Sequence, residues 1–448
     1  MKNFKLNKLN KPKEPKRLMK PNKPNKLFWF GFSFIALLMF VIPSPSHADL
    51  EDILSKFHLS MTAQEEYNSN VNLTSTNRKE DYITTVSPGL QFSTSDTTYG
   101  VGLNYRLGLV FYAKEHNNNY ISHAGTLNTW YTFDRRLTFR LRDFLIRSDD
   151  VRESEYSATA VLGEYVLSSQ TQRVVYVRNV AEPSMEYQFG REDRISINYR
   201  SNIYEIQSRQ FEDSREDYIN PRLSYWFDIR NGVSLEYGLT LGHFERSPDL
   251  VGHMAAGRYQ YRFNPKTSIF GEYTFMRRDF DPPSVDYDVH RPSLGIEHAF
   301  SPTLSGSVQA GYFWQKPQGG STTDGFFFNG SLTQRAEKTT YTLLLQGGYT
   351  EDYFTSENLG FTKYYRGVGT ISHRLLERMT VGLTGTLERA EYSSDRKDWT
   401  WGIHGNASYA LLKWLSVSLE AGHRDNDSNQ DNFDYSEYRG LFRITASF

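Results

Sequence analysis

Apolar and polar residues alternate along most of the chain after residue 56. In the stretch Tyr99–Phe111, every second residue is aromatic or aliphatic, whereas the positions between include Asn104, Arg106 and three glycines. Successive side chains of a strand point to opposite faces, so this pattern predicts strands with one apolar face. It recurs at Phe57–Tyr67, Val233–Leu241, Leu304–Trp314, Tyr341–Tyr349, Met379–Leu387, Trp399–Tyr409 and Leu415–Ala421. Only Leu50–Ser55 fits a brief helix, so we predict an all-β fold.

The connections between these stretches alternate in length. Nine short turns, such as Ser95–Thr98, separate ten longer polar loops, such as Asn68–Asp81. Transmembrane barrels have short periplasmic turns and longer outside loops, so we predict one antiparallel up-and-down barrel of about 20 strands, within a range of 18–22. A soluble sandwich or propeller is the alternative, and it would lack this asymmetry. Pro88, Pro183 and Pro292 fall inside candidate strands, where each removes a ladder donor.

The last eleven residues, Tyr438–Phe448, form a further alternating stretch that ends on an aromatic residue. This stretch resembles the closing strand of bacterial outer-membrane barrels, which the barrel-assembly machinery recognises by its terminal Phe and alternating apolar residues. We therefore expect Phe442, Ile444 and Phe448 to face lipid and to act as the assembly signal. Because a barrel leaves no free edge, the partner of this strand should be Phe57–Tyr67.

The N-terminal 48 residues have the pattern of a secretory signal peptide. Ten basic residues and one acid are followed by a 16-residue apolar run, Leu27–Ile42, and by the cleavage pattern Ser46-His47-Ala48. An N-terminal membrane anchor is the alternative, but the run is shorter than the roughly 20 residues that a spanning helix needs. We expect cleavage after Ala48, export through the inner membrane, and a barrel formed by residues 49–448 in the cell outer membrane.

Removing residues 1–48 changes the net charge of the chain. The full sequence has 51 basic and 52 acidic residues, of which the segment holds 10 and 1, so residues 49–448 carry 41 and 51, a net charge of −10 with His neutral. Nucleic acid would favour a basic surface, so we expect no nucleic-acid partner. Acidic surface loops suit an outer-membrane lipid and lipopolysaccharide environment, where divalent ions can bridge acids to anionic headgroups.

The two strand faces predict different surroundings. Aromatic residues make up 15% of the chain, and we expect those near strand ends to form interfacial girdles: Trp130, Tyr131, Phe133, Phe189, Trp226, Phe227, Phe300, Trp314, Trp399, Trp401 and Trp414. Charged residues of the opposite register are the candidate lumen lining: Arg106, Arg140, Arg142, Arg200, Glu236, Arg258, Arg262, Glu272, Glu388, Glu420 and Arg443. They would either select anionic or sugar-like solutes or pair with one another to support a large barrel.

About 20 strands should enclose an aqueous channel unless something plugs it. No plug domain precedes the first strand, so we do not expect a TonB-dependent transporter. The longest loop, Asp149–Gln172, contains a semi-apolar patch, and Ser157–Leu167 within it could also form an extra hairpin. We predict that this loop folds into the mouth and that its deletion raises single-channel conductance.

Motifs that would indicate an enzyme are absent from residues 49–448. Cysteine is absent, no nucleophile elbow, zinc-binding H-E-x-x-H or phosphate-binding loop occurs, and the histidines are dispersed. The stretch Asp425–Asp431 places acids and amides at alternate positions as a calcium loop does, but Gln430 and Ser436 occupy the positions that need Gly and Glu. We expect a solvated acidic loop there, and no catalytic activity, cofactor or metal.

The segment Glu66–Phe92 resembles the opening of the family called putative outer-membrane β-barrel porin 2. It contains E-Y-N-S-N-V at residues 66–71, an Asp at position 81, and V-S-P-G-L at residues 86–90. The resemblance implies an outer-membrane barrel with a pore role and no established catalytic residues. We expect a porin-like channel for passive passage of small hydrophilic solutes. The alternatives are an outer-membrane component of exopolysaccharide secretion and a surface receptor or structural barrel that its loops close.

Overall fold

The computed structural model describes residues 55–149, 174–207, 211–354 and 360–448. The expected signal peptide and its cleavage site, the loop Asp149–Gln172 beyond its first residue, and the alternative hairpin Ser157–Leu167 lie outside these residues. Among the described residues, no helix is both long and apolar enough to cross a membrane.

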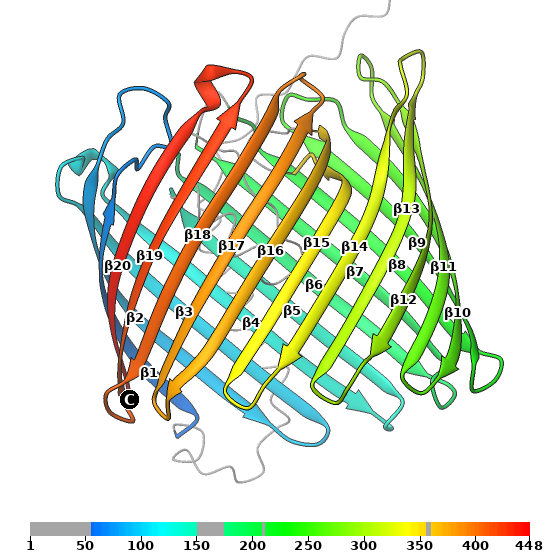
Figure 1. The fold of residues 1–448 in the computed structure, drawn as a ribbon, viewed down its shortest axis with the longest axis horizontal. Helices are drawn as coiled ribbons and strands as arrows, with labels where there is room; N and C mark the ends of the chain where they lie inside the picture. The colour runs from blue at the N-terminus through cyan, green and yellow to red at the C-terminus, as the bar shows by residue number, and fades with distance from the viewer. Residues whose placement is uncertain (1–54, 150–173, 208–210, 355–359) are drawn as a thin grey trace, which may run out of the picture. The chain divides into compact units, whose positions relative to one another are not determined.

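The described chain forms twenty β-strands and two single-turn 3₁₀ helices (Figure 1). The strands are β1 (Phe57–Asn68), β2 (Asp81–Ser95), β3 (Tyr99–Tyr112), β4 (Tyr120–Phe133), β5 (Leu137–Ser148), β6 (Tyr176–Gln188), β7 (Arg194–Ile206), β8 (Ser214–Trp226), β9 (Asn231–Phe244), β10 (Leu250–Asn264), β11 (Thr267–Phe280), β12 (Tyr287–Ala299), β13 (Leu304–Pro317), β14 (Thr323–Arg335), β15 (Thr339–Asp352), β16 (Gly360–Leu376), β17 (Met379–Tyr392), β18 (Lys397–Ala410), β19 (Leu415–Ser428) and β20 (Tyr435–Ser447). The helices η1 (His116–Asn118) and η2 (Asp431–Phe433) lie in connections.

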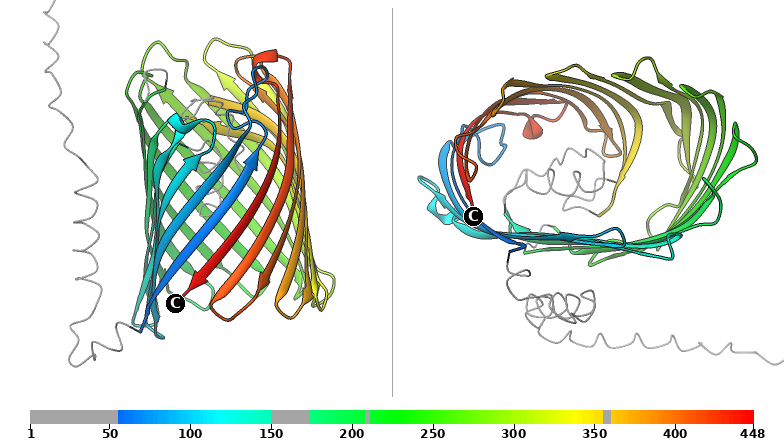
Figure 2. Two further views of the ribbon diagram at one scale, coloured as in Figure 1. Left: turned by 90° about the vertical axis from the view of Figure 1, so that its left-hand side faces the viewer. Right: turned by 90° about the horizontal axis from the view of Figure 1, so that it is seen from below.

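Each strand pairs antiparallel with the next one along the chain, and β20 returns to pair with β1. The register of this closure runs from Ser60 opposite Ser447 to Asn68 opposite Arg439. Two backbone hydrogen bonds between Leu59 and Phe448, of 3.1 Å and 2.8 Å, extend it to the last residue. The sheet is therefore a closed antiparallel barrel, seen from the side and along its axis in Figure 2, and the predicted fold class and closing strand are confirmed.

The connections follow the predicted alternation. All nine short turns lie at one end of the barrel, and the longer connections lie at the other end (Figure 1). Some connections are shorter than the sequence predicts. The polar stretch Lys316–Gly325 has the composition of a longer loop, yet β13 continues to Pro317 and β14 begins at Thr323, so residues 318–322 alone connect the two strands. Hydrogen bonding to the neighbouring strand extends the strands into these polar stretches, which periodicity alone does not reveal.

The three prolines predicted to lie in strands do so, and the strands contain two more, Pro221 in β8 and Pro317 at the end of β13. At Pro292 the regular pairing of β12 with β13 is interrupted between His290 and Ser293, because proline has no N–H to donate. Opposite this point, a Cβ on Gly311 would lie 2.1 Å from the carbonyl oxygen of Pro292. Glycine is therefore required where the two backbones approach.

Candidate functional site in the barrel lumen

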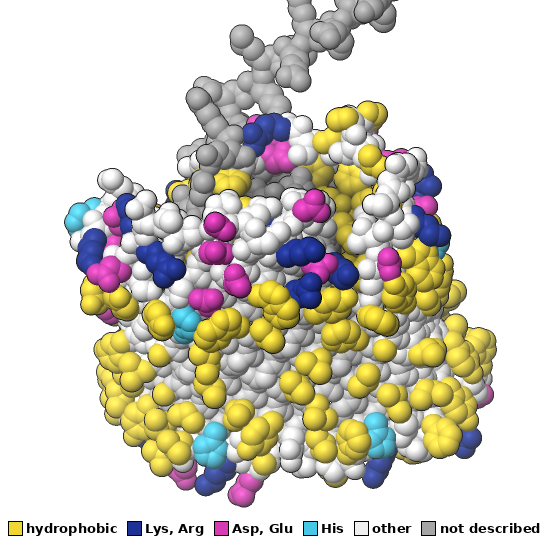
Figure 3. All heavy atoms as spheres, turned by 45° about the horizontal axis from the view of Figure 1, so that its top comes forward, with side chains coloured by type: hydrophobic (Ala, Val, Ile, Leu, Met, Phe, Trp, Pro, Cys, Tyr) yellow, Lys and Arg dark blue, Asp and Glu magenta, His cyan; other side chains and the backbone are white. Residues whose placement is uncertain are grey.

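The two faces of the wall differ in chemistry. On the outer face, Leu294 is 74% exposed and Phe326 is 68% exposed, whereas the inner face buries Asn68 and Glu66. Hydrophobic side chains cover most of the middle of the outer surface in Figure 3, and charged side chains gather toward the two ends. A wall that is apolar outside and polar inside suits a barrel that spans a membrane.

All eleven predicted lumen residues lie in the inward register of their strands, and Phe442, Ile444 and Phe448 lie in the exposed outer register of the closing strand. Eight of the eleven are held by ion pairs or hydrogen bonds to inner-face or turn residues. Four of the pairs, with their N–O distances, are Arg200–Glu216 (2.7 Å), Arg258–Glu297 (2.8 Å), Arg291–Glu272 (3.5 Å) and Arg443–Glu420 (3.3 Å). The others are Arg366–Glu388, Arg262–Glu192 at 3.0 Å, and Asn220, which donates to Glu236 at 3.0 Å. Most of the inner charge is therefore neutralised within the wall.

The seam between β1 and β20 contains one of these networks. Arg443 donates to Gln64 across the seam at 3.0 Å while it pairs with Glu420 on β19. Closer to the long-loop end of the same seam, Arg439 pairs at 2.8 Å with Glu66, whose side chain is almost completely buried. These contacts join the first strand to the last two, so the inner charges contribute to closing the barrel as well as to lining it.

Three of the predicted arginines do not take part in close ion pairs. Arg106 on β3 and Arg142 on β5 are exposed and form no ion pair within the described parts of the chain. Arg140 has only a 4.0 Å contact with Glu186, a carboxylate that Arg194 also approaches at 3.6 Å. Glu182 on β6 lies opposite Arg142 in the strand register, without an ion pair. An exposed guanidinium that no carboxylate contacts closely is available to a dissolved anion. The inner faces of β3 and β5 are therefore the part of the wall best suited to bind solute.

Strand β15 leaves the wall near its long-loop end. Its pairing with β14 covers only Phe328–Arg335, although β14 begins at Thr323 and β15 continues to Asp352. Gly348 has a φ of 148°, a backbone conformation that other residues rarely adopt. Beyond this glycine, β15 stays paired with the start of β16, and the two strands bend into the lumen (right panel of Figure 2). We call residues 348–354 and 360–364 the inner hairpin.

An aromatic cluster holds the inner hairpin against the inside of the wall. Phe361 and Tyr349, whose ring centroids lie 5.0 Å apart, are each close to Phe313 of β13, at 6.1 Å and 5.0 Å. The hydroxyl of Tyr349 donates to the sulfur of Met276 on β11 at 3.0 Å. Phe313 is completely buried, which is the environment of a hydrophobic core rather than of a water-filled channel.

A buried ion pair and a second aromatic contact extend this docking. Arg278 on β11 donates to Glu351 at 2.6 Å, and both side chains are about one-tenth exposed. Tyr287 on β12 also donates to Glu351 at 2.6 Å. Farther along the hairpin, Phe354 stacks on Phe244 of β9 at 5.4 Å. The inner hairpin thus reaches from its own position in the wall to β9 and occupies part of the lumen at the long-loop end.

The apolar face of the inner hairpin does not contact lipid, although the apolar register of the strands was predicted to do so. Tyr349 and Phe361 belong to the same face of β15 and β16 as the lipid-exposed Leu343 and Leu345. Because the strands bend inward, that face meets the inner surface of β11–β13 instead of lipid. The sequence does contain the double glycine Gly347-Gly348 at the bend, but alternation alone cannot show that a strand leaves the wall.

The connection between β1 and β2 also packs at the long-loop end. Val71 and Leu73 in this connection are buried, Val71 with Ile83, Val110 and Tyr112 of the inner wall. The side chain of Asn70 is fully buried and donates to the carbonyl of Thr74 at 2.8 Å. Two segments therefore fill parts of this end of the lumen with their own side chains.

Two of the predicted girdle tryptophans face inward. Trp130 and Trp226 alternate with Tyr131 and Tyr225, which are exposed on the outer face, so the tryptophans cannot also point outward. Trp226 lies flat over Gly232, and the guanidinium of Arg262 stacks on the ring at 3.5 Å. The prediction was wrong for these two residues because neighbouring aromatics in one strand must face opposite sides. The outer girdle retains Trp314, half-buried against His290, and the exposed aromatics Tyr131, Phe133, Phe189, Phe227, Phe300, Trp399, Trp401 and Trp414.

The calcium-like segment is not a loop over its first four residues. Strand β19 continues to Ser428, so Asp425 and Asp427 point outward while Asn426 is buried and accepts a hydrogen bond from Thr400. An extended strand spaces these two carboxylates about 6.6 Å apart along one face and cannot wrap around an ion, and the continuation of β19 corrects the expectation of an acidic loop from residue 425 onward. In the described parts of the chain, no group of three or more His, Asp or Glu side chains is arranged to hold a metal ion.

Several histidines have ordinary polar partners on the wall. The hydroxyls of Tyr105, Tyr237 and Tyr273 each lie 2.7 Å from a ring nitrogen of His123, His253 and His290, respectively. These pairs repeat on the outer face, where each satisfies a tyrosine hydroxyl that would otherwise be unpaired in an apolar environment. They account for three of the dispersed histidines without any catalytic arrangement.

Comparison with solved structures finds other large barrels at low sequence identity. The siderophore receptor PirA from Acinetobacter baumannii aligns at 8% identity over 88% of this chain and 80% of its own, with a TM-score of 0.49. The FrpB iron transporter from Neisseria meningitidis aligns at 8% identity over 90% and 83%, also with a TM-score of 0.49. The outer membrane protein OpdK from Pseudomonas aeruginosa aligns at 9% identity over 88% and 99%, with a TM-score of 0.43. No curated protein matches the chain.

Comparison with family models gives one match. Residues 246–448, which include strands β10 to β20, match the family described as putative beta-barrel porin 2. This is the family that Glu66–Phe92 resembles, although that segment lies outside the matched residues. The closed barrel with an apolar outer wall agrees with the match in architecture. Residues 246–448, somewhat less than half of the chain, therefore match the model of the putative beta-barrel porin 2 family, as the resemblance predicted, and the closed barrel has the architecture of an outer-membrane β-barrel.

Proposed function

We propose that this barrel is a porin-like channel for the passive passage of small hydrophilic solutes and that it favours anions. The observation that carries the proposal is the exposed arginine group Arg106, Arg140 and Arg142 on the inner faces of β3 and β5. These three guanidinium groups outnumber the carboxylates of Glu182 and Glu186 on the neighbouring strand β6, so the field that a solute meets there is positive. Export by the signal peptide 1–48 and insertion by the barrel-assembly machinery are part of the proposal.

The inner hairpin narrows this channel in the proposal. It fills space in front of β9–β13 near the extracellular end, whereas the arginine group lies on β3 and β5. Small solutes would pass along the part of the lumen that these arginines line. The constriction favours small hydrophilic solutes over long polymers, because a polymer must fit through the narrow section along its whole length.

Conductance and ion selectivity in planar bilayers test the proposal. In a potassium chloride gradient, the wild-type reversal potential should indicate chloride preference. Each of the variants Arg106→Gln, Arg140→Gln and Arg142→Gln should shift it toward potassium. Arg277→Gln is the matched control, because Arg277 is about as exposed as Arg140 but lies on the outer face of β11 beside Asp279. Its selectivity should equal that of the wild type.

Other outcomes would contradict the proposal in different ways. A folded barrel that is silent at every voltage would indicate a structural or receptor barrel. A conducting barrel whose selectivity is unchanged in all three arginine variants would refute the role of the arginine group. Block of the current by an acidic polysaccharide, with no effect of the corresponding monosaccharide, would favour polysaccharide export over general passage.

A further inference from the structure

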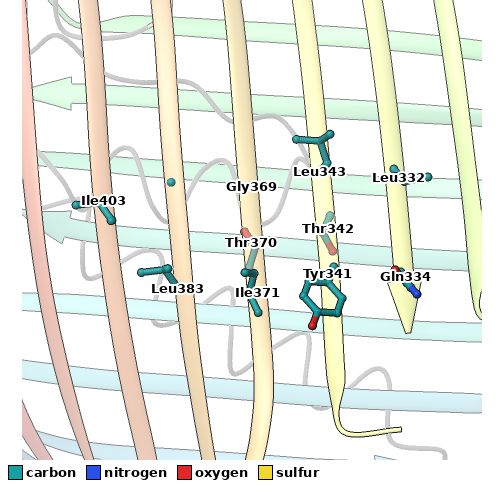
Figure 4. A pocket seen from close by; sticks show the side chains of 11 residues that line it. Leu332, Gln334, Tyr341, Thr342, Leu343, Gly369, Thr370, Ile371, Leu383 and Ile403 are labelled. Atoms are coloured by element: carbon teal, nitrogen blue, oxygen red, sulfur yellow. The ribbon is translucent and has the colours of Figure 1, made fainter. Parts of the chain in front are cut away.

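An apolar groove lies on the outer wall of β14–β18, toward the periplasmic end. Its volume is about 320 Å³. The lining side chains come from neighbouring strands and are mainly aliphatic: Leu332, Leu343, Ile371, Leu383 and Ile403, with Tyr341 and Gln334 (Figure 4). Most of these side chains are in the outward register that faces the hydrocarbon of the membrane. The groove is separate from the lumen and from the arginine group of the proposed channel.

Two glycines form the floor of this groove. A Cβ built on Gly369 or on Gly385 would meet no heavy atom within 4 Å. By contrast, Gly347 on the outer face of β15 is covered by the rings of Phe328 and Tyr365. The space above Gly369 and Gly385 is therefore left unfilled by the chain, and in a membrane it is filled by hydrocarbon.

The groove is polar at one end only. In Figure 4 the hydroxyl of Tyr341 and the amide of Gln334 lie at the end nearest the turn between β14 and β15, whereas Leu343 and Leu332 lie toward the middle of the wall. This order of polar and apolar groups matches a lipid whose headgroup is at the periplasmic surface and whose acyl chain runs toward the membrane centre.

Basic residues surround the polar end. Lys338, Arg378 and Lys413 occupy the turns below the groove, together with the acids Glu337 and Glu377, whereas Arg335 and Arg374 lie in the inward register of β14 and β16. These five turn residues are exposed, and none of them forms an ion pair within the described parts of the chain. The local excess of one positive charge favours an anionic headgroup, since Lys and Arg near a membrane surface attract anionic lipids.

We infer that this groove is a binding site for an anionic glycerophospholipid of the periplasmic leaflet. One acyl chain lies over Gly369 and Gly385, and the phosphate lies among the basic residues of the adjoining turns. Binding of this kind orders one lipid at a fixed position on the barrel. The inference is independent of whether the lumen conducts.

Native mass spectrometry of the full barrel tests the site. The protein is purified in a mild non-ionic detergent and titrated with phosphatidylglycerol or phosphatidylethanolamine of the same acyl chains. Wild type should retain phosphatidylglycerol preferentially. Gly369→Val and Gly385→Val place a Cβ in open space and their methyl groups on the floor of the groove, so these variants should fold and lose most of the retained lipid.

A control variant and two charge variants distinguish binding of the acyl chain from binding of the lipid headgroup. Gly440→Val is the matched control, because a Cβ at Gly440 also meets nothing within 4 Å but this residue lies on the outer face of β20, away from the groove. It should bind lipid as the wild type does. Lys338→Gln and Arg378→Gln should each lower the preference for phosphatidylglycerol about five-fold while leaving total lipid retention similar.

Three results would overturn the inference. Equal retention of both lipids by the wild type would exclude an anionic headgroup site. Retention in Gly369→Val equal to that in Gly440→Val would exclude the groove as the place where the chain binds. A stable dimer or trimer that disappears in Gly369→Val, without any change in bound lipid, would instead assign the groove to contact with a second copy of this chain.

Discussion

Replacing Phe361 by Ala should release the inner hairpin and widen the channel. The Phe361 side chain is 7% exposed and packs on Tyr287 and Phe313 of the wall, with ring centroids 5.9 Å and 6.1 Å away. A buried Phe→Ala change costs about 3–5 kcal/mol. We use the lower value, because Tyr349, the third ring in contact, lies on the same hairpin and moves with it.

A loss of about 3 kcal/mol lowers the ratio of docked to undocked hairpin roughly 10²-fold, since each 1.36 kcal/mol is a factor of ten. The ion pair between Arg278 and Glu351 remains in this variant, so we expect frequent opening rather than permanent release. Single-channel recordings should therefore show transitions to a higher conductance that wild type rarely visits. Adding Glu351→Gln, which leaves the buried Arg278 without its carboxylate, should lengthen the time spent in the wider state.

Phe326→Ala is the matched control for this prediction. Phe326 lies on β14 beside the bend, but its side chain is 68% exposed on the outer face and does not touch the hairpin. Its conductance should match wild type, and retarded migration of unheated samples in gel electrophoresis should show that all variants are folded. If Phe361→Ala and Phe326→Ala give the same conductance histogram as the wild type, the hairpin is not the constriction.

Two further predictions concern the assembly and the acid sensitivity of the barrel. Deleting Phe448 removes both backbone hydrogen bonds to Leu59 and the stacking on Trp414, so outer-membrane levels should fall, whereas Phe300→Ala in a periplasmic turn should leave them unchanged. Normal levels of the deletion variant would count against the closing role of Phe448. The hydrogen bond from Arg262 holds the pKa of Glu192 below its ordinary value. Because the pKa of Glu192 is lower in the folded protein than in the unfolded chain, its ionised carboxylate stabilises the folded protein at pH values above the ordinary carboxyl pKa. This stabilisation is lost as the pH falls through the pKa of the folded protein. Because the pair is about one-third exposed, Glu192→Gln should lower the free energy of unfolding by less than about 1 kcal/mol at pH 7 and by nothing near pH 2. Urea titrations at the two pH values measure this, and an equal loss at both would refute the assignment.

Features that depend on alternation were predictable from the sequence. The strand number, the antiparallel order and the pairing of Phe57–Tyr67 with the last strand follow from period two and from the spacing of the turns. The inward register of the charged residues follows from the same period. Which Arg meets which Glu was not predictable, because pairs such as Arg262–Glu192 join a strand to a distant turn and depend on stagger between strands.

Features that depend on the path of a strand could not be predicted from alternation. Tyr349 and Phe361 have the pattern of lipid-facing residues and indeed share a face with them, yet they pack inside the barrel because the backbone bends at Gly348. A two-residue period distinguishes the two faces of a strand but does not say what each face meets. The pair Gly347-Gly348 next to Tyr349 was the sequence feature that could have indicated a bend in this strand.

The seam between β1 and β20 has a consequence for how the barrel folds. Residues that touch there, such as Thr62 and Thr445, are 383 positions apart in the chain. Contacts of such long range form slowly, because the entropy of closing a long loop is lost before the contact is made. Until the last strand is in place, every intermediate sheet has two unpaired edges that can associate with other chains. The barrel is therefore prone to association with other chains until the seam forms. The Arg–Glu contacts of the seam stabilise the barrel only after closure and cannot prevent that association.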